Sequence, residues 1–238
     1  MKVDVCFSPA LYRYYADSND IIVVVVDIFR ASTTMCAAFN NGAKYIIPVA
    51  SVEEAKEYKA KGYLVGAERN VKRCDFADFG NSPFDYTPEK VKDKEIVFTT
   101  TNGTMAIDEA ADSDCLIVGA FSNLRAVTRF CIEREKDVII LCSGWNNRFN
   151  LEDSLFAGAL AEALVEHGGY SPQSDAVKVA LSMWEEAKPN IRQYINRSEH
   201  IKRLEANNLQ DSVNYCLTLD TVDLVPEYNK TTKRLSIL

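Results

Sequence analysis

Three apolar runs in this sequence stop abruptly at a cluster of polar residues, and this repeated arrangement constrains the fold more than any other feature. Residues 22–26 (IVVVV) are followed at once by Asp27 and shortly afterwards by Arg30. Residues 96–98 lead into TTTNGT, and residues 138–141 lead into CSGWNNRFNLED. Short apolar runs bounded by turn residues are typical of buried strands. Ligands bind at the carboxyl ends of such strands in α/β proteins, so the sequence predicts an α/β fold with its site at that edge.

Strand and helix patterns alternate over the first two thirds of the chain. Because parallel strands are joined by right-handed helical crossovers, this order predicts an α/β fold in which helices flank a mainly parallel, mixed sheet. The expected strands are 3–7, 21–26, 45–48, 63–65, 96–99, 115–118 and 138–142, and the expected helices are 32–41, 52–60, 105–111, 124–135 and 151–166.

The chain changes character after Gly169. Polar helical patterns cover 173–187, 198–206 and 211–216, and the segments TVDLVPEYN and KRLSIL have the pattern of a closing pair of strands. We therefore expect an α/β core at 1–169 that carries the site motifs. A C-terminal part at 170–238 packs on it, because that part is too polar for a large core of its own. A chain of this length is also compatible with a single domain.

Composition excludes several classes of function. The net charge of −7 opposes general nucleic-acid binding, which depends on Lys and Arg neutralising phosphates. No apolar run approaches the roughly 20 residues of a membrane span, so no membrane partner is expected. Seven cysteines without a CxxC pair indicate reduced thiols in a cytoplasmic protein. A homodimer is compatible with the sequence, which does not determine the number of copies.

The first polar cluster supplies Asp27, Arg30, Ser32 and Thr33 as candidate site residues. Asp27 is interpreted as a metal ligand or nucleophile. The alternative is a helix cap, for which Ser32 and Thr33 are better placed. The planar fork of Arg30 suits a phosphate or sulfonate group, although a structural ion pair is the alternative. We also expect the two hydroxyls to bind substrate.

The second cluster, TTTNGT, directly precedes a helix, and helix N-termini attract anions. Its candidate substrate-binding residues are Thr100, Thr101, Asn102 and Gly103. A plain capping turn is the alternative. The GxxxxGK[ST] pattern is absent, so nucleotide binding is not supported. The irregular loop at 72–88 adds an amide and a hydroxyl to the set, Asn81 and Ser82.

The third cluster contains Cys142, Ser143 and Gly144, followed by Glu152 and Asp153 at the start of a helix. Cys142 is a candidate nucleophile if its thiol pKa is lowered, and otherwise a small apolar residue ending a strand. Ser143 and Gly144 are expected to contact substrate. Glu152 is a candidate catalytic group, and both acids are candidate metal ligands. The alternative is that Glu152 and Asp153 are ordinary acidic residues in the first turn of a helix.

These carboxylates and amides form a set of hard oxygen ligands of the kind that Mg²⁺ takes. The predicted metal ligands are Asp27, Glu68, Glu152 and Asp153. The chain has only two histidines, His167 and His200, and neither belongs to a strand-end cluster. We therefore expect a carboxylate or a metal-bound hydroxide to serve as the base.

The segments VDIFRASTT, GAER, FGNSP, TTTNGT and CSGWNNRFNLEDSLFAG, in this order, resemble the 2-phosphosulfolactate phosphatase (ComB) family. The resemblance implies a three-layer α/β/α fold and a Mg²⁺-dependent acid phosphatase. The implied reaction hydrolyses 2-phospho-3-sulfolactate, or a similar small phosphorylated 2-hydroxy acid, to 3-sulfolactate and phosphate, a step towards coenzyme M. Two alternatives remain open from the residues alone. One is a non-catalytic domain that binds an anion and a metal ion, and the other is a metal-independent phosphatase that uses Cys142.

Overall fold

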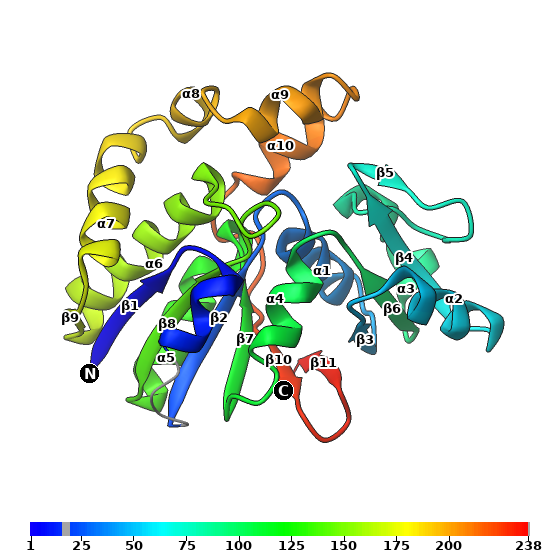
Figure 1. The fold of residues 1–238 in the computed structure, drawn as a ribbon, viewed down its shortest axis with the longest axis horizontal. Coiled ribbons are helices and arrows are strands. Elements are labelled where there is room, and N and C mark those ends of the chain that lie inside the picture. The colour runs from blue at the N-terminus through cyan, green and yellow to red at the C-terminus, as the bar shows by residue number, and fades with distance from the viewer. Residues whose placement is uncertain (16–19, 238) are drawn as a thin grey trace.

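The computed structural model describes residues 1–15 and 20–237 and shows a wide mixed sheet with helices on both faces (Figure 1). The predicted three-layer α/β/α fold is confirmed. The strands are β1 (Lys2–Cys6), β2 (Ile21–Val26), β3 (Tyr45–Pro48), β4 (Leu64–Arg69), β5 (Lys72–Arg73), β6 (Glu95–Thr99), β7 (Cys115–Gly119), β8 (Asp137–Cys142), β9 (Ser171–Pro172), β10 (Pro226–Asn229) and β11 (Arg234–Ile237). Leu238, the last residue of the predicted final strand, lies outside the described residues.

The α-helices agree with the expected segments apart from two short ones, α3 and α8, which were not predicted. The α-helices are α1 (Ala31–Asn40), α2 (Val52–Ala60), α3 (Pro88–Val91), α4 (Gly103–Glu109), α5 (Leu124–Arg134), α6 (Leu151–Gly168), α7 (Asp175–Ala187), α8 (Ile191–Ile195), α9 (Glu199–Glu205) and α10 (Gln210–Cys216). Three short 3-10 helices are η1 (Pro9–Tyr14), η2 (Pro83–Asp85) and η3 (Phe121–Asn123). Within the described residues, none of the helices combines the length and the apolar character that a membrane span requires.

Strand β2 lies inside the sheet, between β7 and β8, and all six of its residues are buried. Successive side chains of a strand point to opposite faces. Ile22 and Val24 therefore join the apolar cluster formed with α5, α6 and α7, whereas Val23 and Val25 join the cluster formed with α1 and α4. A continuous apolar run is what a strand covered on both faces needs. The run therefore places Asp27 directly after the carboxyl end of β2.

The C-terminal hairpin β10–β11 lies in the middle of the sheet. The strand order is β5-β4-β6-β3-β11-β10-β7-β2-β8-β1-β9. The hairpin pairs antiparallel with β7 on one side and β3 on the other. It therefore separates one parallel block, β4, β6 and β3, from another, β7, β2, β8, β1 and β9. Because the pairings through the hairpin are all antiparallel, the strands of the two blocks run in opposite directions. Residues from strand ends of both blocks nevertheless reach one cavity, since a wide sheet twists and distant strands do not keep their local direction.

The segment after Gly169 contributes to both the sheet and one helical layer. Helix α7 packs along α6, and the hairpin completes the sheet between β3 and β7. The short helices α8, α9 and α10 cross above the upper ends of the central strands (Figure 1). This position brings α9 to the edge at which the three polar clusters leave the sheet.

Candidate active site

A cavity of about 190 Å³ lies at this edge, between the strand ends and α9. Its walls come from segments far apart in the sequence. The residues lining it are Asp27, Phe29, Arg30, Glu68, Asn70, Val71, Asn81, Thr100, Thr101, Asn102, Trp145, His200, Arg203, Leu204, Ala206 and Asn207. Seven of the predicted site residues are therefore brought together here: Asp27, Arg30, Glu68, Asn81, Thr100, Thr101 and Asn102.

Asp27 follows the last residue of β2 and is only 7% exposed. Burial raises the pKa of its carboxyl group to about 6, and the charge of His200 opposes this rise. One carboxylate oxygen accepts a long hydrogen bond of 3.3 Å from the N–H of Ala31. At Gly103 a Cβ atom would come within 2.8 Å of the other oxygen. The TTTNGT turn thus needs glycine in order to pack against Asp27.

Arg30 lies at the start of α1, is 3% exposed and lines the cavity. Its guanidinium group donates to the hydroxyl of Ser212 at 3.4 Å. Burial lowers its pKa from the ordinary value, and nearby charges, including those of Glu68 and Asp27, oppose this effect. Among the described residues no carboxylate lies within 4 Å of it, although exposed arginines elsewhere have such partners. A buried cation without an ion-pair partner is suited to binding an anion.

Oxygen atoms without partners add to this polar wall. The side-chain oxygen of Asn81 and the hydroxyl of Thr101 are buried and have no hydrogen-bond partner among the described residues. The backbone carbonyl of Asn81 accepts a hydrogen bond from the hydroxyl of Thr34, which holds the 72–88 loop against α1. The carboxylate of Glu68 accepts from the N–H of Val71 in the following turn. Buried polar atoms normally have a hydrogen-bond partner, so the unpaired side-chain oxygens of Asn81 and Thr101 indicate a ligand in the cavity.

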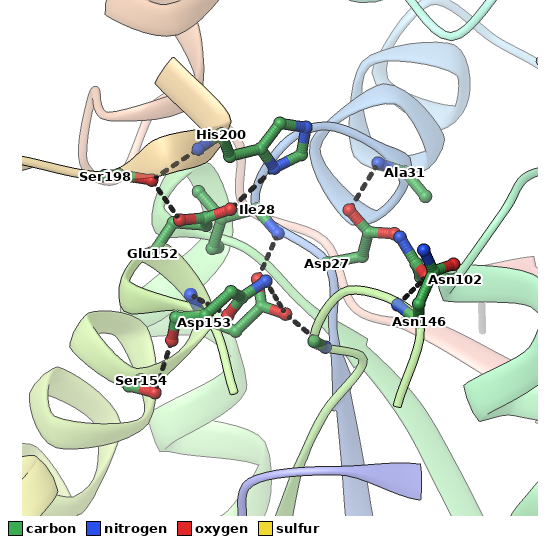
Figure 2. A network of polar contacts seen from close by, with 12 residues as sticks. Asp27, Ile28, Ala31, Asn102, Asn146, Glu152, Asp153, Ser154, Ser198 and His200 are labelled. Atoms are coloured by element: carbon green, nitrogen blue, oxygen red, sulfur yellow. Dashed lines mark hydrogen bonds and ion pairs between the residues drawn. The ribbon is translucent and has the colours of Figure 1, made fainter. Parts of the chain in front are cut away.

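His200 was not predicted as a site residue, yet its ring lines the cavity. Its Nδ1 lies 2.7 Å from a carboxylate oxygen of Glu152, and the other oxygen accepts a hydrogen bond of 3.1 Å from Ser198 (Figure 2). Ser198 also caps α9. The local sequence SEHIKR has the pattern of an ordinary capped helix, so it contains no signal for this contact. The expectation of a site without histidine is wrong.

Asp153 has a structural position. One carboxylate oxygen accepts from the N–H of Ile28 at 2.8 Å, and the other accepts from the N–H of Gly144 and the amide of Asn150 (Figure 2). It does not line the cavity. The geometry therefore opposes the predicted roles of Asp153 as a metal ligand and of Gly144 as a substrate contact. Their polar groups instead hold the β2–α1 and β8–α6 turns together.

Four predicted hydroxyl contacts also lie outside the cavity lining: Ser32, Thr33, Ser82 and Ser143. The hydroxyl of Ser32 donates to the backbone carbonyl of Asp27 at 2.7 Å, and that of Thr33 donates to Ile28. These bonds shape the turn after β2. The backbone N–H of Ser143 donates to Val26 at 2.8 Å, so Ser143 and Asp27 leave the sheet at the same edge, as expected. Its buried hydroxyl has no partner among the described residues.

Cys142 and Arg148 have the CxxxxxR spacing of cysteine-dependent phosphatases, so the position of this thiol matters. Cys142 is 1% exposed and packs in the apolar cluster beside Val26 and Phe156. Burial, followed by the charge of Asp153, raises the pKa of the thiol well above its ordinary value. Only a thiolate is an effective nucleophile. The structure therefore opposes the cysteine route.

We expect Cys142→Ala to retain most of its activity, with a loss below about tenfold, because the thiol forms no bond with substrate and only supports the turn. Steady-state kinetics on a phosphomonoester would measure this. A Cys142→Ala protein that binds substrate normally but does not turn over would show that the thiol is the nucleophile.

The four predicted metal ligands do not form a single centre. In residues 1–15 and 20–237, no group of three or more His, Cys, Asp or Glu side chains is arranged to hold a metal ion. Glu152 is fully buried, and its oxygens contact Ser198 and His200. Only Asp27 and Glu68 face the cavity, and the Glu68 charge raises the pKa of Asp27. Mg²⁺ commonly binds one or two carboxylates together with waters and substrate phosphate, and this pair fits that requirement.

Comparison with known sequences assigns this chain to a family of enzymes. The sequence profile of a family described as 2-phosphosulpholactate phosphatase matches residues 6–231. The chain belongs to this family. The predicted resemblance and the predicted enzyme class, a phosphoric monoester hydrolase, are confirmed.

Relatives from several bacteria match the sequence of this chain over most of their length. A "Probable 2-phosphosulfolactate phosphatase" from Clostridium novyi (strain NT) is 37% identical over 232 residues, which cover 96% of this chain and 97% of that protein. A protein of the same name from Caldanaerobacter subterraneus subsp. tengcongensis is 36% identical, covering 89% of each chain. One from Thermotoga maritima is also 36% identical, covering 85% of this chain and 87% of that protein.

Proposed function

We propose that this chain is a Mg²⁺-dependent phosphatase that hydrolyses 2-phosphosulfolactate, or a similar small phosphorylated 2-hydroxy acid, to the free hydroxy acid and phosphate. One observation carries the proposal: two arginines, which have no carboxylate partner within 4 Å in the described part of the chain, face a small cavity that also contains acidic side chains. Arg30 is one of them. The other is Arg203 on α9, whose guanidinium carbon lies 4.2 Å from the ring centre of Trp145.

Two separate cationic groups suit a substrate with more than one anionic group. Arg30 is buried beside Asp27 and Glu68, so we assign the phosphate to it. Arg203 lies on α9, where its contact with Trp145 holds it in place, and we assign the sulfonate or carboxylate to it. A cavity of about 190 Å³ suits a molecule of this small size. Family membership supports the same substrate class.

Asp27 and Glu68 would hold the magnesium ion. When bound, the ion neutralises charge on the phosphoryl oxygens and so assists phosphoryl transfer. The number of acids supports a cation here. Asp27, Glu68, Glu152 and Asp153 are all buried at this edge, where the basic side chains that line the cavity are Arg30, His200 and Arg203. A non-catalytic anion receptor would not need these carboxylates.

A reducing, cytoplasmic location is also part of the proposal. All seven cysteines are free thiols and six are buried, a pattern that supports a compartment without disulfide formation. The place of the reaction in coenzyme M formation depends on the physiological substrate and stays a prediction.

The test is a substrate panel assayed with Mg²⁺ and with EDTA. We expect hydrolysis of 2-phosphosulfolactate to exceed that of 2-phospholactate, because only the former offers a sulfonate to Arg203, and 3-phosphoglycerate to be the poorest. EDTA should abolish turnover, and added Mg²⁺ should restore it. Substrate binding without turnover would support the non-catalytic receptor. Turnover that resists EDTA would contradict the metal dependence.

A further inference from the structure

We propose that His200 is the general acid of this reaction and that Glu152 is its positioning residue. This inference rests on the proposed phosphatase function. His200 donates a proton from Nε2 to the ester oxygen that joins the hydroxy acid to phosphorus. Glu152 orients the ring and compensates its charge, and Ser198 holds the Glu152 carboxylate in place.

The contact between Glu152 and His200 joins two segments that are 48 residues apart in the chain. Glu152 lies in the first turn of α6, and its side chain is fully buried beneath α9. His200 is the only basic side chain within 4 Å of it among the described residues. Ser198 donates a hydrogen bond to the second carboxylate oxygen. A buried carboxylate requires such compensation, so this pair is a specific arrangement and not an exposed ion pair.

The same geometry determines which ring nitrogen is available for catalysis. Nδ1 is directed at Glu152, and the ring edge packs against Phe29, with ring centres 5.8 Å apart. Figure 2 shows the other nitrogen, Nε2, on the side of the ring that is remote from Glu152. Because the ring lines the cavity and its Nδ1 is occupied, Nε2 is the nitrogen that can reach a bound substrate. A carboxylate that fixes the tautomer and orientation of a catalytic histidine is a known device.

The chemistry requires an acid because the leaving group is an alkoxide. As the P–O ester bond breaks, its electron pair passes to the ester oxygen, which takes the proton from Nε2 and leaves as the free hydroxyl group. A water molecule supplies the oxygen that forms the new bond to phosphorus. One proton of this water returns the imidazole to its charged form, and the other stays on the phosphate. The sum is one phosphomonoester dianion and one water converted to one alcohol and one hydrogen phosphate.

Leaving groups of different basicity distinguish a general acid from a structural residue. 2-Phosphosulfolactate releases an alkoxide that needs protonation, whereas acetyl phosphate releases a carboxylate that does not. We expect His200→Asn to lower kcat/KM for 2-phosphosulfolactate by about 10²–10⁴-fold, the usual contribution of general acid catalysis. The loss on acetyl phosphate should be below about tenfold. Equal losses on both substrates would overturn the assignment.

Glu152→Gln should show the same selective loss to a smaller extent, because glutamine retains the shape but cannot compensate the imidazolium charge. A purely structural role for Glu152 would lower both rates together. The matched control is His167→Asn, since His167 is the other histidine of the chain and its side chain is 71% exposed. We expect this control to match the wild type on both substrates.

The wild-type protein supplies a second test that does not depend on the folding of any variant. With a general acid in place, kcat/KM across a series of alkyl and aryl phosphates should depend little on the pKa of the leaving alcohol. A steep dependence would overturn the role of His200. No turnover of any phosphomonoester by the wild type would overturn the proposed function and this inference together. A uniform loss in His200→Asn would overturn this inference alone.

Discussion

The substitution Asp27→Asn is expected to lower Mg²⁺-dependent kcat/KM by about 10³-fold or more, since a bound metal contributes several kcal/mol to transition-state stabilisation. Asparagine has nearly the same shape and can still accept the N–H of Ala31, the contact that Asp27 makes at 3.3 Å. It removes the negative charge that faces Glu68 across the cavity. The fold should therefore persist while metal binding is lost.

Isothermal titration with Mg²⁺, together with kinetics at limiting and saturating Mg²⁺, measures this effect. Asp108→Asn is the matched control, because Asp108 is an exposed acid on α4. Wild-type activity of Asp27→Asn at limiting Mg²⁺ would show that Asp27 only caps the turn before α1. An Asp27→Asn protein that binds Mg²⁺ normally but does not turn over would instead point to a direct role in the chemistry.

The second large effect is expected at Arg30. Arg30→Gln should lower kcat/KM for the phosphorylated substrate by about 10³-fold, within the range found when a positioned charge is removed from a phosphoryl or oxyanion site. Arg30 is buried and has no carboxylate partner within 4 Å among the described residues, so most of its charge is available to the ligand. Arg30→Lys should recover only part of the loss, because an ammonium group cannot form the bidentate contact.

Inorganic phosphate serves as a competitive inhibitor in the same experiment. Its inhibition constant should rise with Arg30→Gln in parallel with the loss of kcat/KM. Arg125→Gln is the control, because Arg125 is exposed at the start of α5, outside the cavity lining. If Arg30→Gln binds phosphate as tightly as the wild type, the anion is held elsewhere, and Arg203 becomes the first alternative.

Elements whose residues interact locally were predictable from the sequence. The run at 22–26 predicts β2 because a strand that is buried on both faces must be apolar throughout. The predicted helix at 52–60 agrees with α2. Ser51 caps this helix because its hydroxyl oxygen accepts a hydrogen bond from the N–H of Glu54. The position of Asp27 directly after β2 likewise follows from local order. These features depend on periodicity and capping, which act over a few residues.

Contacts between distant segments were decided only by the tertiary structure. The sequence by itself determined the α/β class, the polar strand ends and seven of the residues that line the cavity, because the position of a polar residue after a strand follows from local order. It did not determine that the C-terminal hairpin enters the middle of the sheet, or that α9 brings His200 to Glu152. It also predicted Asp153 as a metal ligand, although its carboxylate binds the N–H groups of Ile28 and Gly144. Such pairings arise because a buried charge or polar group takes whichever partner the packed chain brings near, and no local pattern specifies that partner.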